Sequence, residues 1–347
     1  NYDSTTINKL LLQKGDILVE KSGGGDLTPV GRVIGFDLPI NALYANFIER
    51  LRTNSLVRPK YLLYLLALYY YVGVSKKYIK QTTGIQNLDL SSFLTEYISI
   101  PSLSEQQAIA DYLDHKCSLI DSIIEKQKAV IEKLKLYEQS IITEAVTKGL
   151  DPTVKMKPSR IEWIGEIPEH WETYKLNSLC LTIGDVDHRM PEAVDVGIPY
   201  ISPSNFVGFE EIDFENAKQI TKESFEEIAQ KIKPEFGDII FSRYASLGCI
   251  RQVKVTFDFL VSYSCAIIRP NNKRILSRYL YYYLLSYLII QEIAYYANSN
   301  TQSNVGIDSI KRFKIVLCSL VEQKKIVEYL DTKCAAINLS IEMKQAA

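Results

Sequence analysis

The 347-residue sequence predicts a mixed α/β (α+β) chain made of two copies of one domain, separated by a long helix. Three observations support this prediction. A block of sixteen residues recurs 217 positions later, further matching blocks lie upstream of it in the same order, and the stretch from Ser102 to Lys148 contains neither proline nor glycine.

The clearest repeat is the block in which a Glu-Gln pair, an Ile and a Tyr-Leu-Asp triplet keep identical spacing. It runs from Ser102 to Cys117 and again from Ser319 to Cys334. The upstream pairs are Asn87, Leu90 and Ile98 with Asn304, Ile307 and Ile315 at an offset of 217, Tyr61-Leu62 with Tyr279-Leu280 at 218, and Gly15-Asp16-Ile17-Leu18 with Gly237-Asp238-Ile239-Ile240 at 222. The small drift in offset indicates connecting loops of different length in two copies of one domain.

Each copy has the same order of predicted elements: a strand after Gly-Asp, a second β-rich run, an apolar helix, a polar loop and another strand. In the first copy these are Ile17–Glu20, Gly31–Phe36, the apolar run Tyr61–Val74, and Tyr97–Ile100. In the second copy they are Ile239–Ser242, Ser262–Arg269, the apolar run Tyr279–Ile290, and Phe313–Leu317. Both apolar runs are shorter than the ~20 residues of a membrane span, so we expect buried helices and no membrane partner.

A long helix is predicted to follow the last strand of the first copy. Ser102 stands three residues before Glu105, and Ser319 three before Glu322, so each pair can form a capping box. Gly149 is a credible stop for the first of these helices. A helix of this length needs a partner along its apolar stripe. The alternative is two shorter helices broken near Lys116. The second copy's helix is expected to begin at Val321, and the first copy has no counterpart of Trp171–Phe236.

The patterns divide the chain into four parts. We expect a first domain without its front portion at 1–116 and a central helix at 117–150. A second domain follows at 151–333, and the start of a distal helix at 334–347.

The composition argues against several classes of protein. Net charge is −1, so contact with nucleic acid must come from local patches rather than from a broad basic surface. Six cysteines without a C-x-x-C pair, beside only three histidines, do not indicate a zinc site, and we expect reduced thiols in a cytoplasmic protein. Because the chain has no G-x-x-x-x-G-K-[ST] or G-x-S-x-G motif, we expect neither a catalytic centre nor a bound cofactor.

Two polar segments leave alternatives open. The glycine-rich Ser22–Asp26 lacks the Lys-Ser/Thr of a phosphate cradle, and is either a loop near DNA or an ordinary surface loop. Asp185, Asp187 and His188 follow the predicted strand Leu179–Ile183, and form either a metal group or a polar loop.

Both copies also present polar, amide-rich loops at corresponding positions. Sequence-specific DNA contacts need Arg, Asn, Gln, Ser and aromatic side chains on loops, with Lys and Arg for the phosphates. For any single residue an ordinary polar surface loop is the alternative. The candidate DNA-binding residues are Lys76, Lys77, Lys80, Gln81, Thr82, Thr83, Gln86 and Asn87 in the first copy, and Ser242, Arg243, Tyr244, Ser246, Asn298, Asn300, Thr301, Gln302, Ser303 and Asn304 in the second.

Several of these segments resemble a known family, the specificity (S) subunits of type I restriction–modification systems. Trp163–Trp171 is similar to the opening of a target-recognition domain in that family. Gly237–Ile240 and the Glu-Gln…Ile…Tyr-Leu-Asp helix that closes each copy are also similar. A long helix separates the two copies, as in the family. The resemblance covers nearly the whole chain, and the order of the motifs makes it specific.

The resemblance implies a function. Two target-recognition domains would each read one half of a split site in double-stranded DNA, and long conserved helices would form an antiparallel coiled-coil spacer between them. The same helices would dock methyltransferase (M) subunits carrying S-adenosylmethionine, joined by restriction/translocase (R) subunits that use ATP and Mg. The chain itself would be non-catalytic. The alternatives are the specificity module of a single-chain restriction–methylation enzyme and a coiled-coil scaffold with no DNA role.

Overall fold

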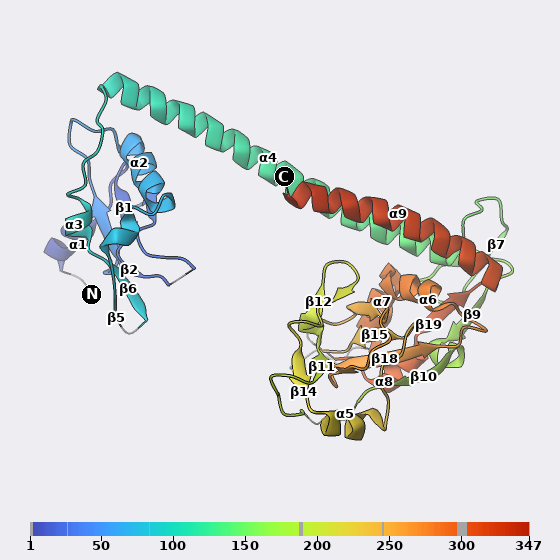
Figure 1. The fold of residues 1–347 in the computed structure, drawn as a ribbon. Coiled ribbons are helices and arrows are strands. Elements are labelled where there is room, and N and C mark those ends of the chain that lie inside the picture. Colours follow the sequence, from blue (N-terminus) through green and yellow to red (C-terminus); the bar gives the residue numbers. More distant parts are fainter. Residues whose placement is uncertain are drawn as a thin grey trace. The chain divides into compact units, whose positions relative to one another are not determined.

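The computed structural model describes residues 3–25, 27–82, 84–186, 190–244, 246–296 and 304–346. The chain forms two compact units, Asn1–Glu125 (unit 1) and Lys126–Ala347 (unit 2) (Figure 1). Helix α4 (Leu103–Lys148) contributes its first half to unit 1 and its second half to unit 2. Within the described residues, no helix combines the length and the apolar character that a membrane span requires.

Unit 1 is built on a three-stranded antiparallel sheet in the order β3-β1-β4. Residues of β1 (Ile17–Glu20) alternate between buried and half-buried, so Ile17 and Val19 point into the core. Helix α2 (Pro59–Tyr71) adds Leu66 to the same core. The other elements of unit 1 are α1 (Ser4–Leu10), β2 (Ser22–Gly23), β3 (Val33–Gly35), β4 (Ile48–Leu51), η1 (Ser75–Tyr78), β5 (Ile79–Thr82), β6 (Ile85–Leu88) and α3 (Leu90–Phe93).

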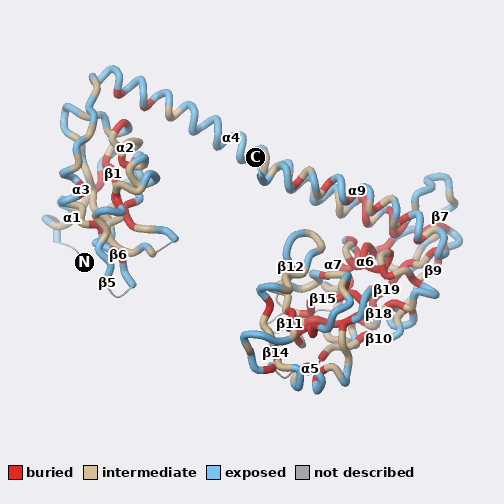
Figure 2. The backbone as a smooth tube through the Cα atoms, in the orientation of Figure 1, coloured by how far each residue is buried: buried red, intermediate tan, exposed pale blue. Residues whose placement is uncertain are grey.

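Unit 2 has a larger core around a four-stranded antiparallel sheet in the order β10-β18-β15-β16, and Figure 2 shows its concentration of buried residues. Helix α6 (Ser277–Leu285) covers one face of this sheet with buried tyrosines such as Tyr279 and Tyr283. On the other face, Ile240 and Ile267 pack against residues of the sheet β14-β11-β17.

The remaining bounds in unit 2 are β7 (Met156–Pro158), β8 (Glu166–Pro168), β9 (Glu172–Lys175), η2 (Leu176–Leu179), β10 (Cys180–Gly184), β11 (Ile198–Ile201), η3 (Pro203–Asn205), β12 (Phe206–Val207), β13 (Glu211–Ile212), β14 (Lys218–Ile220), α5 (Lys222–Ala229), β15 (Ile239–Ser242), β16 (Ile250–Gln252), β17 (Leu260–Val261), β18 (Cys265–Pro270), α7 (Tyr287–Tyr296), α8 (Ile307–Arg312), β19 (Lys314–Leu317) and α9 (Leu320–Ala346).

The sheet of unit 1 recurs inside the sheet of unit 2 with the same register. In unit 1, Ile17 of the central strand β1 lies opposite Leu51 of β4. In unit 2, Ile239 of β15 lies opposite Ile268 of β18. Strands β3 and β16 pair with the other edge of the central strand in the same antiparallel way. The internal repeat of the sequence is therefore a repeat of fold.

The two β-rich runs matched in the sequence are both strands, but they are not counterparts of one another. Gly31–Phe36 contains β3, whose counterpart is β16. Ser262–Arg269 contains most of β18, whose counterpart is β4. Strands β4 (Ile-Glu-Arg-Leu) and β16 (Ile-Arg-Gln) are short and partly charged, so they lack the apolar alternation by which a strand is predicted.

The prediction of a strand at Tyr97–Ile100 is wrong, whereas its counterpart in unit 2, β19, is a strand. Strand β19 is paired with β9, which lies in the stretch that has no match in the first copy. A strand needs a neighbour to satisfy its backbone N–H and C=O groups. The described part of unit 1 supplies no neighbouring strand beside Tyr97–Ile100, where tyrosine hydroxyls of α2 bond the carbonyls of Tyr97 and Ser99, so the same sequence pattern forms no strand.

The apolar run of unit 2 also departs from the prediction of one helix. It forms α6 and α7, and Ser286 between them is extended, with φ −67° and ψ 159°. The Ser286 hydroxyl donates to the carbonyl of Tyr283 at 2.6 Å, a local bond by which serine competes with helical hydrogen bonding. In unit 1 the corresponding run forms the single helix α2.

Helix α4 is continuous, which rules out the alternative of two helices broken near Lys116. The predicted capping box is formed: the Ser102 amide donates to Glu105 Oε2 at 2.9 Å, and the Glu105 amide to Ser102 Oγ at 3.3 Å. The helix ends at Lys148 and is followed by Gly149, whose φ of 77° lies in the region that favours glycine.

In unit 2 the second half of α4 packs antiparallel against α9. Ile141 and Val146 of α4 share one core with Leu330 and Ile341 of α9. Figure 1 shows the end of α4 beside the start of α9. The predicted antiparallel helix pair is therefore confirmed for this part of the chain.

The capping residue Glu322 also fastens α9 to the start of the second domain. It accepts hydrogen bonds from His170 Nε2 at 2.7 Å and Trp171 Nε1 at 3.2 Å, besides those from Ser319. Burial alone would raise the pKa of Glu322, but these hydrogen bonds outweigh it and lower the pKa to about 2. The folded state therefore holds the ionised carboxylate more tightly than the unfolded chain does.

Replacing Glu322 by Gln is expected to lower the free energy of unfolding at pH 7 by ~1–2 kcal/mol, after allowance for partial solvent screening. Because the folded pKa lies below the ordinary value of 4.5, this contribution is present above about pH 4.5 and fades as the pH falls toward 2. Urea unfolding at pH 7 and at pH 3 measures how much unfolding free energy the variant loses at each pH. Glu105→Gln is the matched control and should cost less, since within the described residues the Glu105 carboxylate bonds Ser102 alone. An equal loss at both pH values would contradict the assignment.

Candidate nucleic-acid interface

In unit 2 the candidate residues Ser242–Tyr244 open the connection between β15 and β16. The Ser242 amide donates to the Cys249 carbonyl at 2.8 Å, and the Gly248 amide donates to the Ser242 carbonyl at 3.0 Å, which closes the connection into a tight loop. Ser242 is fully buried, and its hydroxyl donates to the Tyr244 carbonyl at 3.0 Å. Strand β15 therefore fixes the base of the loop, while Ser246 further along the loop is exposed to solvent.

Arg243 is buried at the base of this loop, with 5% of the residue exposed. Its guanidinium forms an ion pair with Asp185, and its Nε donates to the Val305 carbonyl at 3.2 Å. Its charge also lies over the Tyr244 ring, 5.3 Å from the centroid. Arg243 thus connects three segments that are distant in sequence. These contacts favour a role in shaping the loop over direct contact with a base.

Asp185 is held as a carboxylate by two cations. It follows β10, and accepts from Lys231 at 3.1 Å as well as from Arg243. Burial raises the pKa of Asp185, but the bonds with Lys231 and Arg243 outweigh this and lower it overall. The Asp185 carboxylate is therefore ion-paired with these two side chains in the folded protein. Among the described residues no cluster of His, Cys, Asp and Glu could hold a metal; Asp187 and His188 lie outside the described residues.

The structure brings Asn304, the last residue of the second candidate segment of unit 2, next to the first segment. The Val305 amide donates to the Arg243 carbonyl at 3.2 Å, so Asn304 lies beside the base of the β15–β16 loop. The other candidates of this segment, Asn298, Asn300, Thr301, Gln302 and Ser303, lie outside the described residues.

Unit 1 repeats this arrangement with different residues. The Leu88 amide donates to the Lys21 carbonyl at 2.8 Å, as that of Val305 does to Arg243. Strand β2 pairs with β6 through Ser22 and Asn87, and the Ser22 hydroxyl donates to Asn87 Oδ1 at 2.7 Å. The glycine-rich loop and the β5–β6 hairpin therefore lie side by side. Gly24 is required in this loop, because a Cβ there would lie 2.8 Å from the Val30 amide.

The other candidates in unit 1 divide into supporting and exposed groups. Gln86 is buried, and its Oε1 accepts from the Val30 amide at 3.3 Å, so it supports the glycine-rich loop. Gln81 is exposed and accepts from Gln86 at 3.4 Å. Thr82 ends β5, and Thr83 lies outside the described residues.

Three exposed lysines, Lys76, Lys77 and Lys80, lie on η1 and β5 and are suited to phosphate contacts. Acidic neighbours balance two of them: Lys80 pairs with Asp89 at 2.8 Å, and Lys77 approaches Glu96 at 4.0 Å.

The connection between the first two paired strands differs in length between the units. It has 12 residues at 21–32 in unit 1 and seven at 243–249 in unit 2. Matched residues of the two units are 222 positions apart at the first strand and 217 apart at the next. This difference of five residues therefore lies entirely within the connection, which is a candidate reading loop.

Sequence reasoning missed two residues that matter for this geometry. The sequence predicts Asp185 as part of either a metal group or a polar loop, and it gives no prediction for Lys231. Asp185 pairs with Arg243, 58 positions away, and with Lys231, 46 positions away, and no spacing pattern in the sequence indicates these ion pairs.

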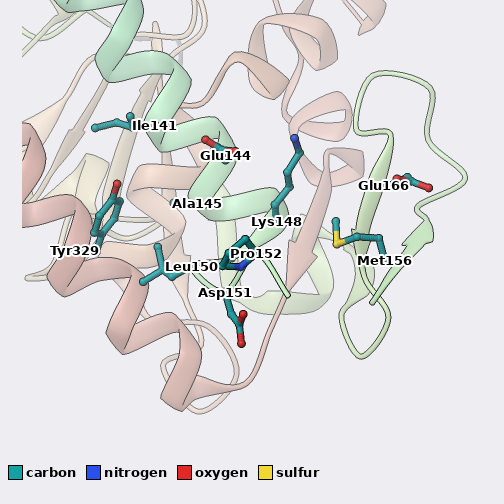
Figure 3. Close-up of a pocket in the computed structure, with 11 residues that line it drawn as sticks. Ile141, Glu144, Ala145, Lys148, Leu150, Asp151, Pro152, Met156, Glu166 and Tyr329 are labelled. Atoms are coloured by element: carbon teal, nitrogen blue, oxygen red, sulfur yellow. The ribbon is translucent and has the colours of Figure 1, made fainter. Parts of the chain in front are cut away.

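A cleft of ≈ 630 Å³ lies in unit 2 between the end of α4, the β7–β8 segment and α9. Figure 3 shows Ile141, Leu150 and Tyr329 around it. Its lining contains none of the candidate DNA-binding residues. The candidate interface is thus made of loops at strand ends rather than of a deep pocket.

Comparison with known proteins identifies the family. A family model described as "Type I restriction modification DNA specificity domain" matches residues 3–133 and 168–345, which contain both pairs of candidate loops. The chain belongs to this family.

Individual members of the specificity-domain family are similar over much of the chain. The type I restriction enzyme MjaVIII specificity subunit of Methanocaldococcus jannaschii is 26% identical over 290 residues, which are 81% of this chain and 65% of that protein. The type I restriction enzyme EcoBI specificity subunit of Escherichia coli is 22% identical over 256 residues, which are 71% of this chain and 53% of that protein. This chain thus spans between half and two thirds of the length of these relatives.

The fold of this family is also found in a solved structure reported as "Structural basis underlying complex assembly and conformational transition of the type I R-M system". It has a TM-score of 0.67 at 15% identity, and the match covers 97% of this chain and 78% of that one. The shared fold agrees with the mixed α/β class and the two repeated domains predicted from the sequence.

Proposed function

We propose that this chain is the DNA-reading subunit of a type I restriction–modification complex, and that it carries no catalytic centre of its own. One observation carries the proposal. In both regions that match the specificity-domain family, the connection between the same two strands lies beside the end of a second polar segment, held there by the same backbone hydrogen bond. In unit 1 these two segments are the β1–β3 connection and the β5–β6 hairpin, and in unit 2 the β15–β16 connection and the segment that ends at Asn304.

Two such reading surfaces suit a target in two parts. Each unit would read one half-site in double-stranded DNA, because its own loops lie on its own sheet framework. The frameworks are alike while the loops differ in length and residues, so the two half-sites would differ in sequence. The helices α4 and α9 would connect the two readers and offer docking surfaces to partner subunits.

The catalytic chemistry would come from those partners. Methyltransferase subunits would carry S-adenosylmethionine, and restriction subunits would use ATP and Mg. The names of the relatives, which are subunits of restriction enzymes, support this division of labour. The six cysteines are free thiols in the structure, which fits a reducing compartment such as the cytoplasm.

The proposal is tested by sequencing methylated bases in cells that express the chain together with its partner subunits. The expected result is one methylated motif made of two short half-sites separated by an unread gap, and its loss when the gene for this chain is deleted. A methylated motif that survives the deletion, or a continuous motif, would refute the proposal.

The purified chain alone is expected neither to methylate nor to cut DNA. The sequence contains no phosphate cradle or nucleophile motif, so both activities should require the partner subunits. Transfer of a radiolabelled methyl group and plasmid nicking measure the two activities. Methylation by the chain after removal of every partner would support the single-chain enzyme instead.

A further inference from the structure

A polar contact between the long helix and the tyrosine-rich helix occurs twice in the chain. In unit 1, Asp114 of α4 accepts from Tyr64 at 2.8 Å and pairs with Lys60, both on α2. In unit 2, Asp331 of α9 accepts from Tyr282 at 2.6 Å and from Arg278 Nε at 2.8 Å, both on α6. The cation, tyrosine and aspartate recur at offsets of 218, 218 and 217.

A second polar contact lies eight residues earlier on each long helix. Gln106 is fully buried; its Oε1 accepts from the Arg58 amide at 2.8 Å and its Nε2 donates to the Leu56 carbonyl at 3.0 Å. Gln323 makes the same bonds with the backbone of Leu276 and Arg274, at 2.8 and 3.1 Å. Each glutamine therefore holds the segment that leads into the tyrosine-rich helix.

We name these sets the unit 1 joint (Lys60, Tyr64, Gln106 and Asp114) and the unit 2 joint (Arg278, Tyr282, Gln323 and Asp331). Eight helical residues span ~12 Å and a little over two turns, so the two polar contacts lie along one side of the long helix. Apolar packing alone tolerates sliding and rotation, whereas polar contacts at fixed positions select one register. Two of them together fix both the rotation and the tilt of the helix against its domain.

We propose that the paired joints are positioning sites, in which Asp114 and Asp331 set the angle between each long helix and its reading domain and so fix the length of the DNA gap. This inference rests on the proposed function. These residues would act on DNA only through the placement of the reading loops, since the loops and the joints share no described contact.

The two joints differ in strength. In unit 2, Arg278 holds Asp331 and also forms a two-point contact with Glu210, at 2.7 and 3.0 Å, which ties in the β12–β13 segment. Its guanidinium lies over Tyr282, 4.7 Å from the ring centroid. In unit 1 a lysine with 57% of its side chain exposed takes this place. Lysine offers a point charge without the planar fork of arginine, so the unit 1 joint is the weaker.

The experiment uses the full chain co-expressed with its partner methyltransferase subunits, and maps methylated sites by sequencing. The variant Asp114→Asn/Asp331→Asn removes both charges and keeps the side-chain shape. The matched control Asp121→Asn/Glu328→Gln removes exposed carboxylates from the same two helices. The variant is expected to keep both half-sites but to accept gaps one base pair longer or shorter. The preference for the original gap should fall about tenfold in the variant and not in the control.

Thermal unfolding and a rescue variant separate positioning from simple loss of structure. A structural role alone lowers the melting temperature and methylation at every gap length equally, and that outcome overturns the inference. If Asp114→Asn abolishes methylation, the exchange Lys60→Asp/Asp114→Lys should restore the original gap, and failure to restore it also overturns the inference. If the double variant keeps the original gap preference, the inference about the joints is wrong, and the proposed function is unaffected. Absence of any bipartite motif with the unaltered chain overturns the proposed function, and the joints with it.

Discussion

Inserting four residues after Ser122 in α4 is expected to lengthen the unread gap of the methylated motif while both half-sites stay the same. Residues 115–126 of α4 are all exposed, so the insertion leaves the contacts of both units intact. Four residues add about one turn and ~6 Å to a continuous helix. That is about two steps of duplex at ~3.4 Å each. Sequencing of methylated sites in cells that express the variant with its partners measures the gap.

A two-residue insertion at the same place is the matched control. It turns the helix beyond the insertion by ~200° and unit 2 turns with it, so the reading loops of one unit face away from the DNA. We expect methylation to be lost in this variant rather than moved to a new gap. Methylation of the original gap at full level in the four-residue variant would show that α4 does not set the distance.

Replacing Arg243 by Ala is expected to abolish recognition of one half-site and to lower the free energy of unfolding by about 3 kcal/mol, the cost of breaking a buried ion pair. The change leaves Asp185 with Lys231 alone and removes a donor from the Val305 carbonyl. The β15–β16 connection and the segment that ends at Asn304 therefore both lose the contacts that Arg243 makes. Urea unfolding and methylated-site sequencing measure the two effects, and Lys155→Ala, which breaks an exposed ion pair of unit 2 outside the candidate loops, is the control.

The alternative for Arg243 is the direct base contact that the sequence alone predicts. In that case Arg243→Ala leaves stability unchanged and relaxes one base position, at ~1–3 kcal/mol of discrimination. Urea unfolding therefore distinguishes the two roles: a loss of stability indicates support of the loop, and unchanged stability indicates direct base contact. Gln302→Ala tests the neighbouring segment in the same assay, and its expected effect is relaxed recognition of the same half-site.

The fold was predictable where the sequence repeats itself. The strand Ile17–Glu20 and its counterpart Ile239–Ser242 have the predicted bounds, and the capping residues Ser102 and Glu105 start α4 as expected. These features depend on short-range patterns, namely apolar alternation and side-chain capping. The Gln106 and Gln323 contacts could also have been anticipated, since both residues belong to the repeated block.

The errors arose where structure depends on a distant partner. Tyr97–Ile100 has the composition of β19 but lacks a neighbour such as β9 within the described residues. Base contact by Arg243 stays a prediction: it has the residue type of a base reader, and the structure shows its guanidinium paired with Asp185, 58 positions away. No local pattern distinguishes an arginine bound to DNA from one bound to a carboxylate, so the candidate site was less predictable than the fold.

The unequal β1–β3 and β15–β16 connections have a consequence for inheritance. All five residues of difference fall between strands that keep the same register, so loop length can change without altering any pair in the sheet. Such a framework tolerates insertions, because lengthening a surface loop costs little free energy. If the proposed function holds, descendants of one gene would acquire new DNA targets through changes confined to this connection and still assemble with unaltered partner subunits.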